Sequence, residues 1–190
     1  MNKRQLILSE AKRLFGRYGY LGFTLKQLAQ ACDMTSPALY YFYSSKAELF
    51  EDCLLSEISA RQAVLERCMT YSNTIVEFAG ALAHEAIEIC DVASFTTGQA
   101  MREIIHLPEK MQEEIRGAWD SMMITPVEDF VKRILVESSS NIPYRLIATY
   151  FINMATFSAA NNTEFTRDEL ANLFVTVAKA LQPPESLSGK

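Results

Sequence analysis

His84 and Glu88 are the pair in this sequence whose spacing most resembles that of metal ligands. Four positions apart on a helix, they would share one face and could offer an imidazole and a carboxylate to a metal ion. No further Cys/His cluster with ligand spacing accompanies them, so a solvated or hydrogen-bonded pair is the simpler interpretation. His106, before Leu107-Pro108, is interpreted as a cation at a helix C-terminus. We therefore expect no metal site and no cofactor.

Other reactive groups do not form a recognisable catalytic set. The sequence lacks a Ser/His/Asp arrangement and a glycine-rich phosphate loop, so we expect that the protein is not an enzyme. Its cysteines lie far apart, with no C-x-x-C pair. In a cytosolic chain buried reduced thiols are the default, and thiol sensing is the alternative. The four are Cys32, Cys53, Cys68 and Cys90.

Positive charge is concentrated in residues 1–50. This stretch holds seven basic and three acidic side chains, whereas the remaining 140 residues hold 11 basic and 20 acidic ones. A positively charged N-terminal region is attracted to a phosphate backbone, whereas the acidic remainder of the chain is repelled by it. A chance fluctuation in surface charge is the alternative. The distribution favours a nucleic-acid partner for the N-terminal part.

A membrane location is not expected. No apolar run reaches the roughly 18 uncharged residues that a membrane-spanning helix needs. The basic start at residues 1–4 is typical of a signal peptide, but Glu10, Lys12 and Arg13 interrupt what would have to be its apolar stretch. The sequence therefore predicts a soluble, cytoplasmic protein.

Helical periodicity runs along the chain, and no stretch shows sustained alternation of apolar and polar residues. We therefore predict an all-α fold. Pro126 should kink or split the helix that contains it near Ile124-Thr125. Beyond the N-terminal region, helices are expected at residues 46–70, 74–92, 96–106, 109–137, 142–160 and 167–181.

The N-terminal region predicts one longer helix that precedes two short ones. The first ends at Gly19-Tyr20-Leu21-Gly22, since glycine accepts the left-handed cap conformation. Thr24 is expected to cap a second helix, residues 25–31. After a tight turn at 32–34, Thr35 caps a third helix with Pro37 in its first turn. The buried face of the first helix is formed by Ile7, Ala11, Leu14, Phe15 and Tyr18.

Two short helices joined by a tight turn, behind a basic helix, are typical of helix-turn-helix DNA-binding proteins. The second of the pair must be exposed on one side to enter a major groove about 12 Å wide. We expect Leu28, Ala29 and Leu39 to lock it in place. Because four aromatic residues in a row cannot all point inward on a helix, Tyr40 and Tyr41 should face outward.

Several spaced patterns in residues 4–49 identify this region more closely. They are Arg4-x-x-Ile7-Leu8-x-x-Ala11-x-x-Leu14-Phe15, Gly19-Tyr20, Thr24-Leu25-x-x-Leu28-Ala29 and Leu39-Tyr40-x-x-Tyr43-x-x-Lys46-x-x-Leu49. They resemble the DNA-binding domain of the tetracycline-repressor (TetR) family. Two positions depart from the family pattern: Asp33 replaces a turn glycine, and Tyr43 replaces a phenylalanine. Aspartate tolerates a left-handed conformation, and a buried tyrosine needs a partner for its hydroxyl.

The resemblance implies roles for residues on and around the two short helices. Phosphate contacts are expected from Thr24, Tyr40 and Lys46, with Lys26 and Gln27 as weaker candidates. Reading of the bases would involve the start and outer side of the third helix. No Arg, Asn or Gln lies on that face, so part of the specificity is expected to come from DNA shape. The expected base-reading residues are Thr35, Ser36, Pro37, Ala38 and Tyr41.

By resemblance, residues 1–49 form the helix-turn-helix DNA-binding domain and residues 50–182 a helical effector-binding and dimerisation domain, followed by a flexible tail at 183–190. Two helices from each subunit would form a four-helix homodimer interface; burial of both within one subunit is the alternative. One of the two carries an apolar stripe of Leu170, Leu173, Phe174, Val177, Ala178 and Leu181.

A cavity for an unknown small-molecule effector is expected among the helices that start near Thr74, Phe95 and Glu109, although such apolar stripes are more often ordinary core. Its expected lining is Phe78, Leu82, Phe95, Met101, Ile105, Trp119, Met122, Met123 and Phe151.

Taken together, the sequence predicts a ligand-responsive transcriptional regulator that binds a double-stranded DNA operator. The resemblance favours a repressor that a small molecule releases, over an activator of the same fold. A helical enzyme or small-molecule carrier, and a protein-interaction module, are the alternatives from other classes.

Overall fold

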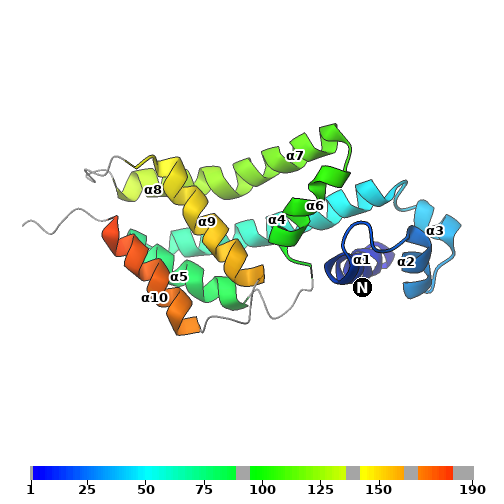
Figure 1. Cartoon of the computed structure of the whole chain (residues 1–190), viewed down its shortest axis with the longest axis horizontal. Coiled ribbons are helices and arrows are strands. Elements are labelled where there is room, and N and C mark those ends of the chain that lie inside the picture. The colour runs from blue at the N-terminus through cyan, green and yellow to red at the C-terminus, as the bar shows by residue number, and fades with distance from the viewer. Residues whose placement is uncertain (1, 89–94, 136–141, 161–166, 182–190) are drawn as a thin grey trace, which may run out of the picture. The chain divides into compact units, whose positions relative to one another are not determined.

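The computed structural model describes residues 2–88, 95–135, 142–160 and 167–181, without the side chains of 86–88, 157–160, 167 and 170. Within these ranges the chain forms helices and no strands, which confirms the all-α prediction (Figure 1). In chain order they are α1 Lys3–Tyr18, α2 Leu25–Ala31, α3 Ser36–Tyr40, α4 Lys46–Thr70, α5 Ile75–Glu88, α6 Thr97–Glu103, the 3₁₀ turn η2 Ile104–His106, α7 Glu109–Trp119, the π segment η3 Asp120–Ile124, α8 Thr125–Ile134, α9 Tyr144–Ala160 and α10 Arg167–Ala180.

The predicted helix caps are present where short-range chemistry dictates them. Thr24 accepts a hydrogen bond from the Gln27 backbone N–H, and the Gln27 side chain accepts one from the Thr24 N–H. This reciprocal arrangement satisfies two donors that a helix start leaves free. The Thr35 hydroxyl accepts from the Ala38 N–H. Both short helices therefore begin as predicted.

Two of the longer predicted helices are interrupted. The segment 96–106 ends as the 3₁₀ turn η2, and the segment 109–137 divides into α7, η3 and α8, with residues 136–137 outside the described ones. The π segment η3 ends at Ile124, directly before the turn that contains Pro126. Because proline lacks the backbone N–H that would continue an α-helical ladder, the break lies where it was predicted.

The chain divides into two compact units. Unit 1 comprises residues 1–60 and 91–119, and unit 2 comprises residues 61–90 and 120–190. One boundary lies inside α4, which therefore contributes residues to both units. This division separates two compactly packed parts of the chain and does not by itself define functional domains. The functional boundary at residue 49 stays a prediction.

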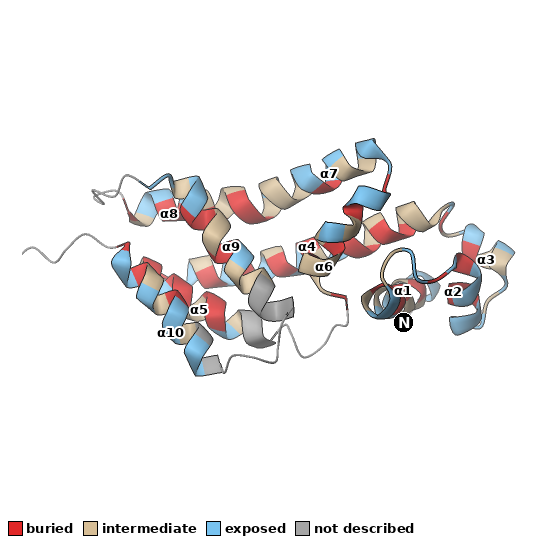
Figure 2. Cartoon of the chain, in the orientation of Figure 1, coloured by how far each residue is buried: buried red, intermediate tan, exposed pale blue. Residues whose placement is uncertain are grey.

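An aromatic cluster forms the core of unit 1. The Phe15 ring lies 4.8 Å from the rings of both Phe23 and Phe50, measured between centroids, and 6.0 Å from that of Phe95. The first two contacts are edge-on, the geometry that aromatic quadrupoles favour. Ile7, Ala11 and Leu14 are buried with Phe15 on one face of α1, as predicted, whereas Tyr18 is 47% exposed. Figure 2 shows both buried and exposed stretches on this helix.

The core of unit 2 is formed by α5, α9 and α10, with α8 packed on α9. The Phe78 ring lies 5.0 Å from that of Phe130 and 5.9 Å from that of Phe151. On α10, Phe174 and Ala178 are fully buried, and α10 packs on α5 of the same chain. Of the stripe predicted for dimerisation, Leu181 is also buried, Val177 is half-buried, Leu173 stays exposed, and the Leu170 side chain is not described.

Tyr43 connects the helix-turn-helix to α1 and α4. Its ring is buried, and its hydroxyl donates to an Asp52 carboxylate oxygen at 2.5 Å and accepts from the Arg4 guanidinium at 3.3 Å. Arg4 also forms an ion pair with Asp52 at 3.0 Å. The departure from the family pattern at this position therefore has the hydroxyl partner that a buried tyrosine requires.

Gly19 closes α1 in a conformation that only glycine adopts readily. Its φ of 70° is positive, as predicted, but its ψ of 178° is extended, so the expected left-handed cap was wrong in that angle. The cause is a long-range contact: Glu103 accepts a hydrogen bond from the Tyr20 N–H at 2.7 Å. A Cβ on Gly19 would lie 2.6 Å from a Glu103 oxygen.

Substituting two glycines of unit 1 in contrasting environments should give effects of opposite sign. Gly19→Ala should lower the free energy of unfolding by about 1–3 kcal/mol, because of its backbone angles and the Glu103 side chain. Gly117→Ala, inside α7 with open space around the added carbon, should raise it by roughly 0.5–1 kcal/mol. Urea unfolding followed by circular dichroism measures both, and a Gly19→Ala protein as stable as wild type would contradict this account.

Tyr43 should make stability depend on alkaline pH. Burial first, and then the hydrogen bond to the Asp52 carboxylate, raise its pKa to about 12, against the opposing effect of Arg4. Because the folded pKa lies above the ordinary value of 10.0, the stabilisation is fully present below pH 10 and is lost as pH rises through about 12. Wild type should lose more unfolding free energy over this interval than Tyr43→Phe. The exposed Tyr40→Phe is the control and should follow wild type; parallel losses in all three proteins would refute the assignment.

Candidate functional site

The turn between α2 and α3 is tightly hydrogen-bonded. The Met34 N–H donates to the Ala29 carbonyl at 2.8 Å, and the Asp33 N–H donates to the Gln30 carbonyl at 3.1 Å. Asp33 has a φ of 51°, in the left-handed region, which confirms that aspartate serves where glycine was expected. Beneath the turn, Leu28, Ala29 and Leu39 are buried as predicted. Since α2 packs on α3, these residues fix the angle between the two helices.

The outer side of α3 carries the residues that were expected to read bases. Tyr41 is 86% exposed and Tyr40 is 53% exposed, whereas the neighbouring Leu39 and Tyr43 are buried, which confirms the predicted division of this aromatic run. Thr35 and Pro37 are exposed, and Ser36 and Ala38 are half-exposed. Tyr41 is supported by an edge-on contact to Phe42, with 5.6 Å between ring centroids. A short helix with an exposed aromatic and hydroxyl surface results.

Thr24, Lys26 and Gln27 lie together at the exposed start of α2. The Gln27 side-chain oxygen is occupied by the Thr24 N–H, but its amide group remains free to donate. Lys26 has no ion-pair partner among the residues that the structure describes. A cation beside a helix N-terminus is an arrangement that attracts phosphate.

Lys46 has a partner that sequence reasoning missed. Its ammonium group donates to the Phe23 carbonyl oxygen and lies 4.1 Å from the centroid of the Phe23 ring and 5.2 Å from that of Tyr20. Burial lowers the pKa of Lys46, and the charge of Glu103 opposes this effect. Lys46 therefore ties the start of α4 to the loop before α2, and a phosphate contact would have to use its remaining N–H groups.

The expected effector-binding residues are distributed over both units. In unit 1, Phe95 is buried against Phe15 and Phe50, Ile105 is 66% exposed, and Met101 and Trp119 are half-buried. In unit 2, Phe78 and Phe151 are fully buried in the core, Met122 is half-buried, and Leu82 and Met123 line one cavity together.

That cavity is small. Its volume of about 20 Å³ leaves room for roughly one water molecule. Arg61 lines it beside Leu82 and Met123, and the remaining wall is formed by Val64, Leu65, Ile152, Ala155 and Thr156.

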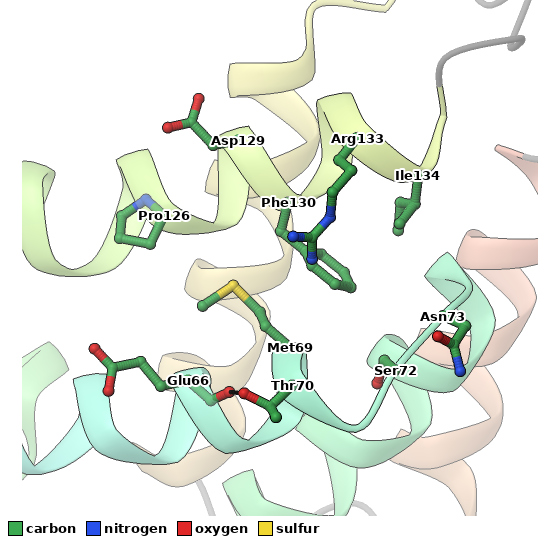
Figure 3. A pocket seen from close by; sticks show the side chains of 10 residues that line it. All are labelled: Glu66, Met69, Thr70, Ser72, Asn73, Pro126, Asp129, Phe130, Arg133 and Ile134. Carbon is green, nitrogen blue, oxygen red and sulfur yellow. Dashed lines mark hydrogen bonds between the residues drawn. The ribbon is translucent and has the colours of Figure 1, made fainter.

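A larger groove lies between the last turns of α4 and helix α8, all within unit 2 (Figure 3). Its volume is about 660 Å³. Sequence reasoning missed it because its walls mix charged, polar and apolar residues from two distant segments, with no periodic signal. The lining residues are Glu66, Met69, Thr70, Ser72, Asn73, Pro126, Asp129, Phe130, Arg133 and Ile134.

Three of the cysteines are buried and free. Burial raises the pKa of the Cys68 thiol to about 11 and raises that of Cys53 as well. These thiols are held in the protonated form, which is the less reactive one. Cys90 and the side chain of Glu88 lie outside the described residues.

Over the described part of the chain, no group of three or more His, Cys, Asp and Glu side chains is arranged to hold a metal ion. No helix within the same ranges has the length and apolar character needed to cross a membrane.

Comparison with known proteins places the N-terminal region in a family. Residues 7–53 match the model of bacterial regulatory proteins of the tetR family. The search of curated protein sequences returned no match.

Solved structures extend the likeness of fold to nearly the whole chain. AibR, solved with isovaleryl coenzyme A and operator DNA, is 20% identical; the match covers 96% of this chain and 100% of AibR, with a TM-score of 0.74. A TetR-family regulator from Agrobacterium tumefaciens is 15% identical over 95% of this chain and 98% of its own, with a TM-score of 0.76. FadR from Bacillus subtilis, solved with stearoyl-CoA, is 11% identical over 94% and 97%, with a TM-score of 0.73.

The matched region contains the packed α2–α3 pair, its exposed tyrosines and the basic start of α2. This match assigns residues 7–53 to the N-terminal, DNA-binding region of bacterial regulatory proteins of the tetR family, and the chain as a whole shares the all-α fold of the solved structures.

Proposed function

We propose that this protein is a repressor that binds its operator as a homodimer and leaves it when a small molecule binds to unit 2. The observation that carries the proposal is the exposed face of α3, where Tyr40 and Tyr41 project from a helix anchored by buried Leu39. An exposed, rigidly held short helix is what entry into a major groove requires. Neither DNA binding nor ligand release needs a catalytic group, so we propose no enzymatic activity.

The contacts to DNA divide into two kinds. Tyr40 and Thr24 are exposed on adjacent helices and would donate to phosphate oxygens, with Lys26 adding charge. Tyr41, Pro37 and the half-exposed Ala38 would contact base edges and thymine methyl groups. This surface offers no bidentate side chain, so the deformability of the operator would supply part of the specificity.

Release by a ligand requires two states with different affinity for the operator. Support comes from the solved structures of the same fold, of which AibR holds both a coenzyme A thioester and operator DNA and FadR holds a coenzyme A thioester. In this chain α4 begins with Lys46 in unit 1 and ends beside the groove of unit 2, so one helix serves both units. A ligand that stabilises one position of α4 would also stabilise the protein state with the corresponding affinity for the operator.

Dimerisation would use α9 and α10. Leu146 on α9 is 59% exposed and Leu173 on α10 is 44% exposed, although the inner sides of both helices are buried within the chain. Exposed leucines on adjoining helices indicate an interface that a second copy would cover. Two DNA-binding domains held about 34–36 Å apart would then reach successive major grooves. The expected cytoplasmic location stays a prediction.

Binding to a labelled operator, obtained by selection from random duplexes, should separate the two kinds of contact. Lys26→Ala should weaken binding to all sequences and reduce the slope of log affinity against log salt by about 1, because one phosphate contact is lost. Tyr41→Ala should reduce the preference for operator over random DNA while leaving that slope unchanged. Fluorescence anisotropy measures both effects.

Lys110→Ala is the matched control, since Lys110 is an exposed lysine of unit 1 that pairs with Glu114 at 3.6 Å, far in sequence from the DNA-binding helices. It should bind as wild type does. Equal losses in Lys26→Ala and Lys110→Ala would show that binding depends on overall charge alone and would contradict the proposed surface.

The dimer should dissociate when a charge is placed in its interface. Leu173→Glu should shift sedimentation equilibrium from dimer toward monomer, because a buried unpaired carboxylate costs several kcal/mol. Leu21→Glu, at a position 74% exposed in unit 1, should leave the assembly unchanged. A monomeric wild-type protein, or a Leu173→Glu protein that remains fully dimeric, would count against this interface.

A further inference from the structure

We propose that the groove between α4 and α8 binds a small organic anion with an apolar body, and that the guanidinium of Arg133 holds the anionic head. The groove volume of about 660 Å³ lies within the range of roughly 300–1,000 Å³ that is usual for sites of drug-sized ligands. The lining residues all belong to unit 2.

Arg133 is the cation of this groove. Its guanidinium carbon lies 5.3 Å from the centroid of the Phe130 ring, and Figure 3 shows the two side chains next to each other on the side of α8 that faces α4. Among the described residues Arg133 forms no ion pair. Its neighbour Lys132 pairs with Glu128 at 2.9 Å and with Asp129 at 3.4 Å. Arg133 thus presents a planar donor fork that matches a carboxylate or phosphate.

The hydroxyl groups of the groove are already engaged. The Ser72 hydroxyl donates to the Cys68 carbonyl at 2.7 Å, and the Thr70 hydroxyl donates to the Glu66 carbonyl at 2.7 Å. Their hydrogens are therefore used within α4 and its end, and they offer a ligand acceptors rather than donors. Asn73 adds a neutral amide donor, and Arg133 is the positively charged donor of the lining for an anionic head.

An apolar body has its own surface in the same groove. Met69 on α4 faces Phe130 and Pro126 on α8, with Ile134 one residue beyond Arg133 (Figure 3). Covering such side chains contributes about 25 cal/mol per Å² of apolar area removed from water. A ligand that consisted of an anion alone would leave this surface uncovered.

Glu66 restricts the ligand to a single negative charge, since it is the carboxylate that faces the groove. Figure 3 shows Asp129 directed away from α4, on the outer side of α8, and Glu66 at the Pro126 end, apart from Arg133. A second anionic group at the far end of a ligand would approach Glu66 and be repelled. The chemistry of the groove therefore selects a monoanion whose far end is neutral or cationic.

If the protein is a ligand-released repressor, as proposed above, the ligand of this groove is its effector. Glu66 and Met69 belong to α4, the helix that starts at Lys46 in unit 1. A ligand that bridges α4 and α8 would stabilise one arrangement of these two helices. Binding to the groove is nevertheless a property of unit 2 that is measured without DNA.

Isothermal titration calorimetry of the full chain with two probe carboxylates, octanoate and phenylbutyrate, tests the site. At least one should bind at millimolar concentration or below, whereas phenylbutylamine and inorganic phosphate should bind at least tenfold more weakly. Arg133→Gln should weaken carboxylate binding at least tenfold, and Lys132→Gln, which removes the same charge one residue away, should leave it within twofold. Circular dichroism confirms that both variants fold, as their exposed positions lead us to expect.

Three results would overturn the site: no binding of either carboxylate by wild type, equal binding by Arg133→Gln, or equal losses in both variants. Because the calorimetry contains no DNA, a protein that failed to bind any operator would refute the proposed function and leave this test intact. Conversely, carboxylate binding that depends on Arg133 without any change in operator affinity would support the site and contradict its role as effector site.

Discussion

The packing of Phe15 is the interaction on which the DNA-binding region depends. Its ring contacts Phe23 from the loop before α2, Phe50 from α4 and Phe95 from the segment before α6. Residues distant in sequence are thereby held around one side chain of α1. The Lys46 ammonium group also donates to the Phe23 carbonyl in the loop before α2. The position of the helix-turn-helix is therefore set by apolar packing around Phe15 and by this hydrogen bond.

Polar contacts fix the relative positions of these helices more precisely than apolar packing alone does. Tyr43, Asp52 and Arg4 connect the end of the α3 region to α4 and α1, and Glu103 receives the Tyr20 N–H from the loop between α1 and α2. Each contact is directional, and each satisfies a group that would otherwise be costly to bury. The tyrosines on the outer face of α3 therefore owe their fixed position to side chains that lie outside that face.

Local chemistry explains which features were predictable from sequence. The caps at Thr24 and Thr35, the left-handed Asp33 and the outward turn of Tyr40 and Tyr41 all depend on neighbours within a few residues. The extended ψ of Gly19 depends on Glu103, more than 80 positions away, and the partner of Lys46 is a backbone carbonyl that carries no sequence signature. The groove was not predictable because α4 and α8 meet only in the folded chain, and no periodic pattern marks its mixed lining.

Thr97, at the start of α6, is fully buried, and its hydroxyl has no hydrogen-bond partner among the residues that the structure describes. Such an orphaned group costs about 1–3 kcal/mol relative to its hydrated form. Unwinding the first turn of α6 would let water reach this oxygen and return part of that free energy, so this turn is poised to fray before its surroundings do. Solvent exchange of backbone amides should accordingly start there, at the N-terminal end of the helix whose last residue, Glu103, secures the α1–α2 loop.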